Sequence, residues 1–188
     1  MAVRILHDQS NDDYHADLAL GSTYLKDWDS RSPAHAEYGV TTINPYVADQ
    51  GTAAHLVFEG KSDLVLEAGD KRVGALWVEK SAQAKASGGT ALPTKAYKAA
   101  MAAGNSARNH PFMYELGYHA ECVDSVEFWH ETSVFTTHPA TGLQIKCKPD
   151  LYFPETGTVL DLKTTVSASP ADFTKSFFRL NYWLQGAF

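Results

Sequence analysis

The sequence predicts an α/β (α+β) fold in which a central mixed β-sheet is flanked by helices. Residues 1–118 combine short helical patterns with Gly and Pro breaks. Residues 124–165 change to runs rich in Val, Ile, Phe and Thr, which favour strands, and residues 170–188 return to helical spacing. A chain of 188 residues with 44% hydrophobic residues can bury one substantial core, so we expect a single domain over 1–188.

The composition excludes several classes of protein. No apolar run approaches the ~20 residues needed to cross a bilayer, and the first ten residues lack the apolar core of a signal peptide, so we expect a cytoplasmic protein with no membrane association. Cys122 and Cys147 have no C-x-x-C spacing, which argues against a disulfide scaffold or a zinc or iron–sulfur site and favours two plain buried or half-buried thiols. A formal net charge of -6 argues against general adhesion to nucleic acid, so any phosphate contact would be local.

The helical part begins with two short helices, expected at residues 21–29 and 32–39. A longer helix is expected over residues 49–60, closing at Gly60, and it places His55 and Glu59 on one face because they are four residues apart. A further short helix is expected from Thr94 to about Ala103, after the break at Gly88, Gly89 and Pro93.

Three strands are expected within residues 125–138, 143–153 and 158–165, separated by the turns Pro-Ala-Thr-Gly and Pro-Glu-Thr-Gly. The last helix is expected over residues 170–188, with Ser169 as N-cap, Pro170 at the first position and Asp172 in the first turn. Its apolar residues recur at helical spacing, which predicts a face packed on the sheet. They are Phe173, Phe177, Leu180 and Leu184.

The two turns predict the register of the strands. If each is a four-residue hairpin loop, His138 pairs with Leu143 and Phe153 with Thr158. Continuing the first ladder places Glu131 opposite Asp150, and continuing the second places Asp161 opposite Asp150. A loop of another length, or a bulge at Pro149, would turn a whole strand over.

Three carboxylates on one face would repel each other, because opposed side chains have Cβ atoms only ~4.5–5.5 Å apart. A bound cation removes this conflict, and hard carboxylate oxygens suit Mg²⁺ or Mn²⁺. Alternation along the strands puts Lys163 on the face of Asp161, and Lys146 and Lys148 on that of Asp150. This arrangement favours phosphodiester hydrolysis, in which a cation polarises phosphate and water and a lysine acts on the nucleophile. Alternatively, these charges form an ordinary solvated strand face.

Pro149-Asp150 and Asp161-Leu162-Lys163 resemble the signature of the PD-(D/E)XK nuclease superfamily, and Thr164-Thr165 resembles its RecB and RecE branches. The likeness to the RecE (exonuclease VIII) nuclease domain, with lambda exonuclease in the same branch, extends to segments at residues 14–38, 51–60, 131–150 and 180–188. It implies a restriction-endonuclease-like core.

The resemblance also implies roles for individual residues. His55, Asp150, Asp161 and the Leu162 carbonyl would be metal ligands, and Lys163 the catalytic lysine. Gln185 would match the glutamine of the Q-x-x-x-Y motif, and Glu131 would serve a second metal. Lys146 and Lys148 would supply the basic residue that the family carries before Pro-Asp and would bind DNA.

The function implied by the resemblance is a magnesium-dependent 5′ to 3′ exonuclease acting on duplex DNA ends in phage or prophage recombination. A RecT-type single-strand annealing protein and a homo-oligomer are the implied partners. Two alternatives are a nuclease of other polarity, including an endonuclease, and a catalytically weak or silent DNA-binding or assembly module of the same fold.

The motif tyrosine expected after Gln185 would fall just beyond Phe188. The last residues lack a Gly or Asn cap and a basic last turn. We therefore expect a C-terminally shortened form with a preformed metal site and weakened DNA engagement.

Overall fold

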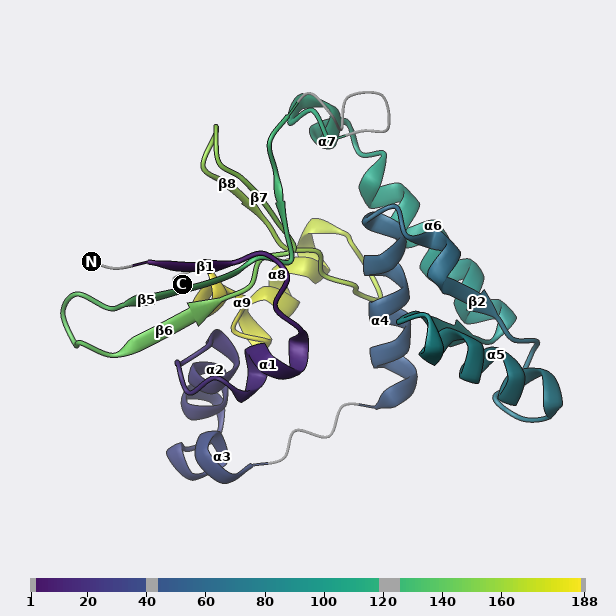
Figure 1. The fold of residues 1–188 in the computed structure, drawn as a ribbon, viewed down its shortest axis with the longest axis horizontal. Coiled ribbons are helices and arrows are strands. Elements are labelled where there is room, and N and C mark those ends of the chain that lie inside the picture. Colours follow the sequence, from purple (N-terminus) through teal and green to yellow (C-terminus); the bar gives the residue numbers. More distant parts are fainter. Residues whose placement is uncertain (1–2, 40–43, 119–125, 187–188) are drawn as a thin grey trace. The chain divides into compact units, whose positions relative to one another are not determined.

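The computed structural model describes residues 3–39, 44–118 and 126–186 (Figure 1). Its elements fall into two units, each built from separate stretches of the chain. The first unit comprises Met1–Thr41, Glu127–Asp161 and Thr165–Phe188, and the second comprises Thr42–Val126 and Leu162–Thr164. That residues 1–188 form one domain stays a prediction.

The first P-x-T-G turn joins β5 (Ser133–Thr137) and β6 (Gln144–Cys147) in an antiparallel hairpin (Figure 1). His138 N–H donates to the Leu143 carbonyl at 2.8 Å, and Gly142 has a φ of 70°, a left-handed conformation that glycine adopts readily. Thr137 pairs with Gln144 and Val134 with Cys147, as the four-residue loop predicts. The first predicted register is therefore confirmed.

The second turn joins β7 (Leu151–Phe153) and β8 (Thr158–Leu160), which also pair antiparallel. Phe153 faces Thr158 and Leu151 faces Leu160, so the second predicted register is confirmed as well. The third strand of this sheet, β4 (Trp129–His130), pairs with β7.

The expected long strands are interrupted midway. Residues 125–138 contain β4 and β5, which belong to different sheets, and residues 143–153 contain β6 and β7. Glu131, between β4 and β5, has a φ of 46°, which breaks the extended backbone. His130 still pairs with Leu151 on the far side of the break. The break therefore spans the same number of residues on both strands, and the predicted register continues across it.

The first unit also contains a strand that the sequence reading missed. Strand β1 (Arg4–Leu6) pairs antiparallel with β5, giving the sheet order β1-β5-β6. On the other edge, Leu20 bridges to Ile145 of β6. The helices of this unit are α1 (Asn11–Ala16), α2 (Ser22–Ser30), α3 (Pro33–Tyr38), α8 (Pro170–Arg179) and α9 (Tyr182–Gln185).

The prediction of one continuous last helix is wrong. Ser169 caps α8 by accepting from the Asp172 N–H, as expected, but Asn181 takes a left-handed φ of 50° and separates α8 from α9. The apolar face is not buried either, because α8 contains no buried residue and Phe173 is 38% exposed. Phe173 instead packs on the rings of Phe177 and Tyr182.

The second unit contains a β-α-β arrangement. Strands β2 (Val65–Glu67) and β3 (Thr90–Leu92) pair in parallel, and α5 (Ala75–Ala86) connects them. A 3₁₀ turn at Ser62–Leu64 precedes β2, and α7 (Pro111–Glu115) follows the longest helix, α6 (Thr94–Arg108). Helix α6 ends five residues later than expected.

Helix α4 (Pro45–Phe58) packs against α6 through small residues (Figure 1). It begins earlier than the predicted residue 49 because Asn44 accepts from the Tyr46 N–H as N-cap and Pro45 occupies the first turn. A Cβ added at Gly104 of α6 would lie 2.5 Å from the Val57 Cβ, so only glycine allows this approach. The core around this contact contains Ala53, Val57, Val65, Leu92, Ala96 and Ala100.

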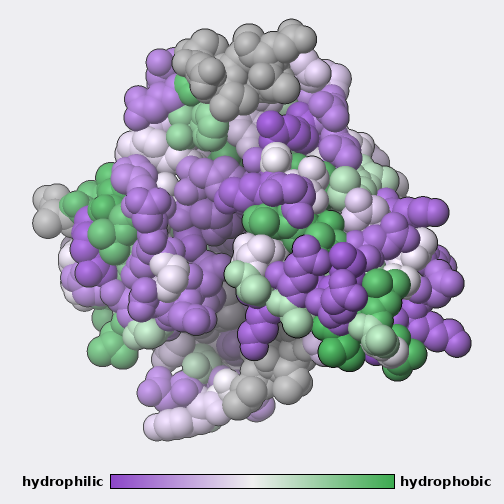
Figure 2. Space-filling model, turned by 45° about the vertical axis from the view of Figure 1, so that its right-hand side comes forward, coloured by the Kyte–Doolittle hydropathy of each residue, from purple (hydrophilic) through white to green (hydrophobic). Residues whose placement is uncertain are grey.

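The α/β class is confirmed, but the strands are distributed over three small sheets in the described residues and do not form one central sheet. Residues 1–118 contain β1, β2 and β3 in addition to helices. Hydrophilic residues predominate on the face in Figure 2, where hydrophobic residues form separate patches. No helix in the described parts of the chain combines the length and hydropathy needed to cross a membrane.

Candidate metal centre

Glu131 and Asp150 lie opposite each other at the break between the two sheets of the first unit. The Glu131 N–H donates to the Asp150 carbonyl at 3.2 Å, one position beyond the pair His130–Leu151. The predicted pairing of these two acidic residues is thereby confirmed at the level of the backbone. The left-handed backbone of Glu131 means that simple alternation along a strand does not set the direction of its side chain.

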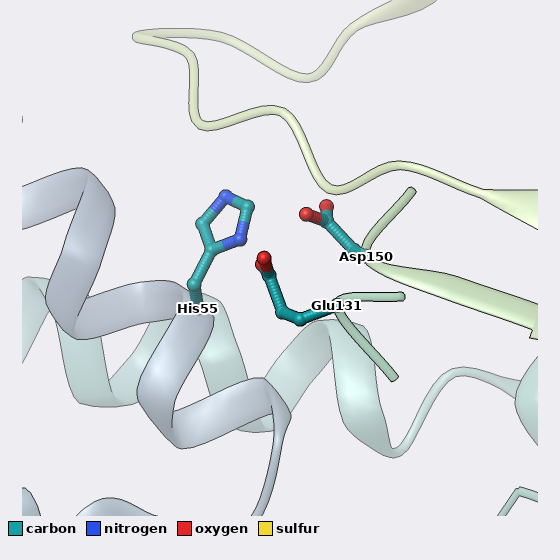
Figure 3. Close-up of side chains that lie close together, drawn as sticks. All are labelled: His55, Glu131 and Asp150. Atoms are coloured by element: carbon teal, nitrogen blue, oxygen red, sulfur yellow. The ribbon is translucent and has the colours of Figure 1, made fainter. Parts of the chain in front are cut away.

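The two carboxylates converge in space. Each offers an oxygen within 4.8 Å of an oxygen of the other, and Figure 3 shows the two carboxylates near each other on neighbouring segments of the backbone. Asp150 is buried, at 8% exposure, and Glu131 is half-buried. Two acids this close, one of them withdrawn from water, repel each other when ionised unless a positive charge lies beside them.

Lys148 supplies one such charge. Its Nζ lies 3.3 Å from Glu131 Oε2, and its side chain is 9% exposed. The same ammonium donates to the Gln9 carbonyl and to Asn11 Oδ1, at 3.2 and 2.6 Å. Lys148 therefore lies at the candidate site, and it offsets part of the charge of Glu131.

Lys146 has different surroundings. Its Nζ donates to the carbonyls of Tyr14 and Asp17, at 2.6 and 2.8 Å, and the residue is 7% exposed. Burial lowers the pKa of Lys146, although Asp17 opposes this shift. These contacts favour a structural role over the DNA contact predicted from the sequence.

Tyr14 is a neighbour of both lysines that the sequence reading did not single out. Lys146 Nζ lies 4.7 Å and Lys148 Nζ 6.0 Å from the centre of its ring. Burial, followed by the nearby Cys147 and Glu131, raises the pKa of Tyr14 to about 12. Its hydroxyl therefore stays protonated at neutral pH, which excludes it as a general base there.

Asp161 directly follows β8, one position beyond the pair Leu151–Leu160. The regular ladder ends at Leu151–Leu160, so the pairing of Asp161 with Asp150 stays a prediction. Asp161 is exposed, and its Oδ1 accepts a hydrogen bond from Gln185 Nε2 at 2.8 Å. The resemblance named both residues as site residues, and the structure joins them.

Lys26 is a further residue that the sequence reading missed. Its Nζ donates to Gln185 Oε1 at 3.1 Å. The available signal was its position in the segment at residues 14–38, which is part of the family resemblance. Nothing in the local pattern distinguishes it from a solvated helix lysine.

The other predicted site residues, His55, Leu162 and Lys163, belong to the second unit. His55 is half-buried on α4, between buried Ala54 and Val57. Glu59, on the same face, has its Oε2 2.8 Å from Lys61 Nζ. Leu162 and Lys163 are half-buried and lie outside regular secondary structure, although a strand was expected there.

Of the two cysteines, Cys147 is a free, half-buried thiol whose pKa is raised by burial, as expected for an unreactive residue. Cys122 lies outside the described residues.

A comparison with protein families gives a match for this chain. The model of a family described as a PDDEXK-like domain of unknown function (DUF3799) matches residues 22–188. The matched range includes every residue that the sequence singled out for the site. Comparisons with curated proteins and with solved structures gave no match.

Proposed function

The chain belongs to this PDDEXK-like family, and on that premise we propose that it is a magnesium- or manganese-dependent deoxyribonuclease, acting as a 5′ to 3′ exonuclease on duplex DNA ends. The observation that carries the proposal is the pair Glu131–Asp150. Two carboxylates converge there, one of them buried, and Asp161 directly follows β8.

The chemistry of these residues fits a hard divalent cation. Aligned carboxylate oxygens are the ligands that Mg²⁺ and Mn²⁺ prefer, and the cation offsets a repulsion that otherwise disfavours the fold. Asp150 and Asp161 would hold the ion, with His55 and the Leu162 carbonyl as further ligands and Glu131 for a second ion. When bound, the ion would polarise the scissile phosphate and lower the pKa of a coordinated water.

Side chains of the protein would act on the attacking water and on the charge of the phosphate. Lys163 would orient or deprotonate the attacking water and offset the charge that develops on the phosphate. Lys148, beside Glu131, would keep that carboxylate in place. With a formal net charge of -6, the protein would bind DNA through local contacts and not through a general positive surface.

Linear duplex DNA tests this proposal directly. With Mg²⁺, we expect label to be released from a 5′-labelled linear duplex at once, from a 3′-labelled one only late, and closed circular DNA to stay intact. EDTA and the variant Asp150→Asn should stop release. Early release from 3′ ends would contradict the polarity, and nicking of the circle would indicate an endonuclease.

A second candidate is a silent module of the same fold that binds DNA or supports assembly. The ion pair between Lys148 and Glu131 favours it, since it offsets part of the carboxylate charge without a metal. A wild-type chain that binds duplex ends equally with Mg²⁺ and with EDTA, and releases no nucleotide, would establish this alternative.

The setting of the activity is also proposed from the family resemblance. A recombination nuclease that exposes single strands would act with a RecT-type annealing protein and as a homo-oligomer. Light scattering of the purified chain, and co-purification with a RecT-type annealing protein, test these two proposals separately from catalysis.

A further inference from the structure

Three polar side chains of the first unit form a continuous chain of hydrogen bonds that ends on a predicted metal ligand. Lys26 Nζ donates to Gln185 Oε1 at 3.1 Å, and Gln185 Nε2 donates to Asp161 Oδ1 at 2.8 Å. Lys26 comes from α2, Gln185 from α9, and Asp161 from the end of β8. This series of hydrogen bonds thus connects residues more than a hundred positions apart in sequence.

The chemistry of the three groups permits only one orientation of the central amide. An ammonium group can only donate hydrogen bonds, and an ionised carboxylate can only accept them. If the Gln185 amide turned over, its NH₂ would face the ammonium and its oxygen would face the carboxylate, so both hydrogen bonds would be lost. Lys26 and Asp161 therefore favour the same orientation of the Gln185 amide, with Nε2 facing Asp161.

Helix α2 holds α9 at two further points. Asn181 Nδ2 donates to Asp29 Oδ2 at 3.2 Å, and Lys26 Nζ lies 5.3 Å from the ring centre of Tyr182. Lys26 and Asp29 are three residues apart and share a face of α2. Asn181, whose left-handed backbone starts α9, and Gln185 are thereby both hydrogen-bonded to the same face of α2.

The geometry points to Lys26 as a positioning residue for the metal site, acting through the Gln185 amide on the carboxylate of Asp161; this inference rests on the proposed function. Hydrogen bonds to ligating carboxylates fix their orientation, and loss of such partners commonly costs about 10- to 100-fold in metal affinity or activity. Lys26 keeps the amide of Gln185 in the orientation that donates to Asp161.

Three substitutions separate positioning from a merely structural tie between α2 and α9. Lys26→Met removes the donor and keeps the length of the side chain, while Lys26→Arg keeps a cation that only donates. Gln185→Glu keeps the tie to α2 as an ion pair with Lys26, but it leaves no N–H for Asp161. A structural tie predicts that Gln185→Glu behaves as wild type, and positioning predicts that it does not.

The measurement is Mn²⁺ affinity by titration calorimetry, together with melting temperatures in EDTA. We expect Lys26→Met and Gln185→Glu each to weaken Mn²⁺ binding by about tenfold. Lys26→Arg should recover most of the loss and melt as wild type in EDTA. Wild-type Mn²⁺ affinity in Gln185→Glu would overturn the inference. So would full affinity in Lys26→Met.

A readout without metal distinguishes failure of this inference from failure of the proposed function. In metal-free ¹⁵N-labelled protein, the Gln185 side-chain proton that donates to Asp161 should have a shift displaced from that of a free glutamine amide, and Lys26→Met should move it toward the free value as this hydrogen bond weakens. Unchanged shifts would overturn the positioning role. If the shifts respond but wild type neither binds Mn²⁺ nor cleaves DNA, the positioning stands and the proposed nuclease function fails.

Discussion

The backbone N–H of Glu131 donates to the carbonyl of Asp150, and the side-chain carboxylates of these two residues come within 4.8 Å of each other. The pairing continues the ladder of β4 and β7 past the last regular pair, at the one point where the left-handed φ of Glu131 interrupts the strand. The pairing therefore holds two carboxylates that repel each other close together beside Lys148, and a bound cation would reduce this repulsion.

Replacing Asp150 tests whether this repulsion serves metal binding. Asp150→Asn keeps the shape but removes a ligand charge, so we expect metal-dependent cleavage to be lost. Metal-free stability should hold or rise, by up to about 1 kcal/mol, because like charges opposite each other are destabilising. Denaturant unfolding in EDTA and a nuclease assay check both outcomes. Glu155→Gln, in the exposed second turn, is the control for loss of one negative charge. A clear loss of metal-free stability would make Asp150 a structural residue.

The sequence predicted the hairpin registers because a four-residue loop fixes the parity of both strands, and the opposition of Glu131 and Asp150 follows from that parity alone. The left-handed turn at Glu131 could not be predicted, since no Gly or Pro marks it on its own strand, although Pro149 on the partner strand had indicated a possible bulge. The same holds for Asn181, where the helical spacing of Leu180 and Leu184 continues through a turn that ends α8. Lys26 and Lys146 owe their roles to partners distant in sequence, which local patterns do not reveal.

Lys163 is predicted to act on water and charge and not as a ligand. Lys163→Met should therefore reduce turnover by at least about a hundredfold, in the range typical of general acid–base groups, while Mn²⁺ affinity stays close to wild type. Single-turnover kinetics and calorimetry measure the two effects. Lys175→Met, on the exposed surface of α8, controls for loss of a positive charge in DNA binding. A parallel collapse of metal affinity would contradict the assigned role.

Two helical glycines of the second unit should respond oppositely to alanine. Gly104→Ala in α6 would bring a Cβ to 2.6 Å from the Ala54 carbonyl oxygen, and such overpacking costs about 1–3 kcal/mol. Gly51→Ala in α4 meets its nearest neighbour at 3.6 Å, an ordinary contact, so the higher helix propensity of alanine should stabilise by up to about 1 kcal/mol. Chemical unfolding of both variants provides the comparison. Equal effects on stability would mean that α4 and α6 leave room for a Cβ at Gly104.

The pH dependence of stability should include a contribution from Asp17. The hydrogen bond from the Ala19 N–H, followed by that from Arg4, lowers the pKa of Asp17 below its ordinary 3.8. The ionised form is therefore favoured on folding, and its contribution is present above that ordinary value and lost as pH falls through the lowered one. Asp17→Asn should be less stable than wild type at pH 6, and the gap should close below about pH 3.8. Unfolding curves at several pH values measure it, and a constant gap would contradict the assignment.

Lys146 offers the sharpest distinction between a structural residue and a DNA contact. Its ammonium is buried and donates to the carbonyls of Tyr14 and Asp17, which join α1 and the following loop to β6. Lys146→Met would leave both carbonyls without this donor, and an unsatisfied buried group costs about 1–3 kcal/mol. We expect lower stability in EDTA with little change in duplex affinity at a temperature where the variant stays folded. Lys148→Met is the matched variant on the same strand segment, and because its ammonium lies beside Glu131, it should change metal-dependent cleavage. If Lys146→Met kept full stability and lost duplex affinity, the DNA contact predicted from the sequence would be correct and the structural role wrong.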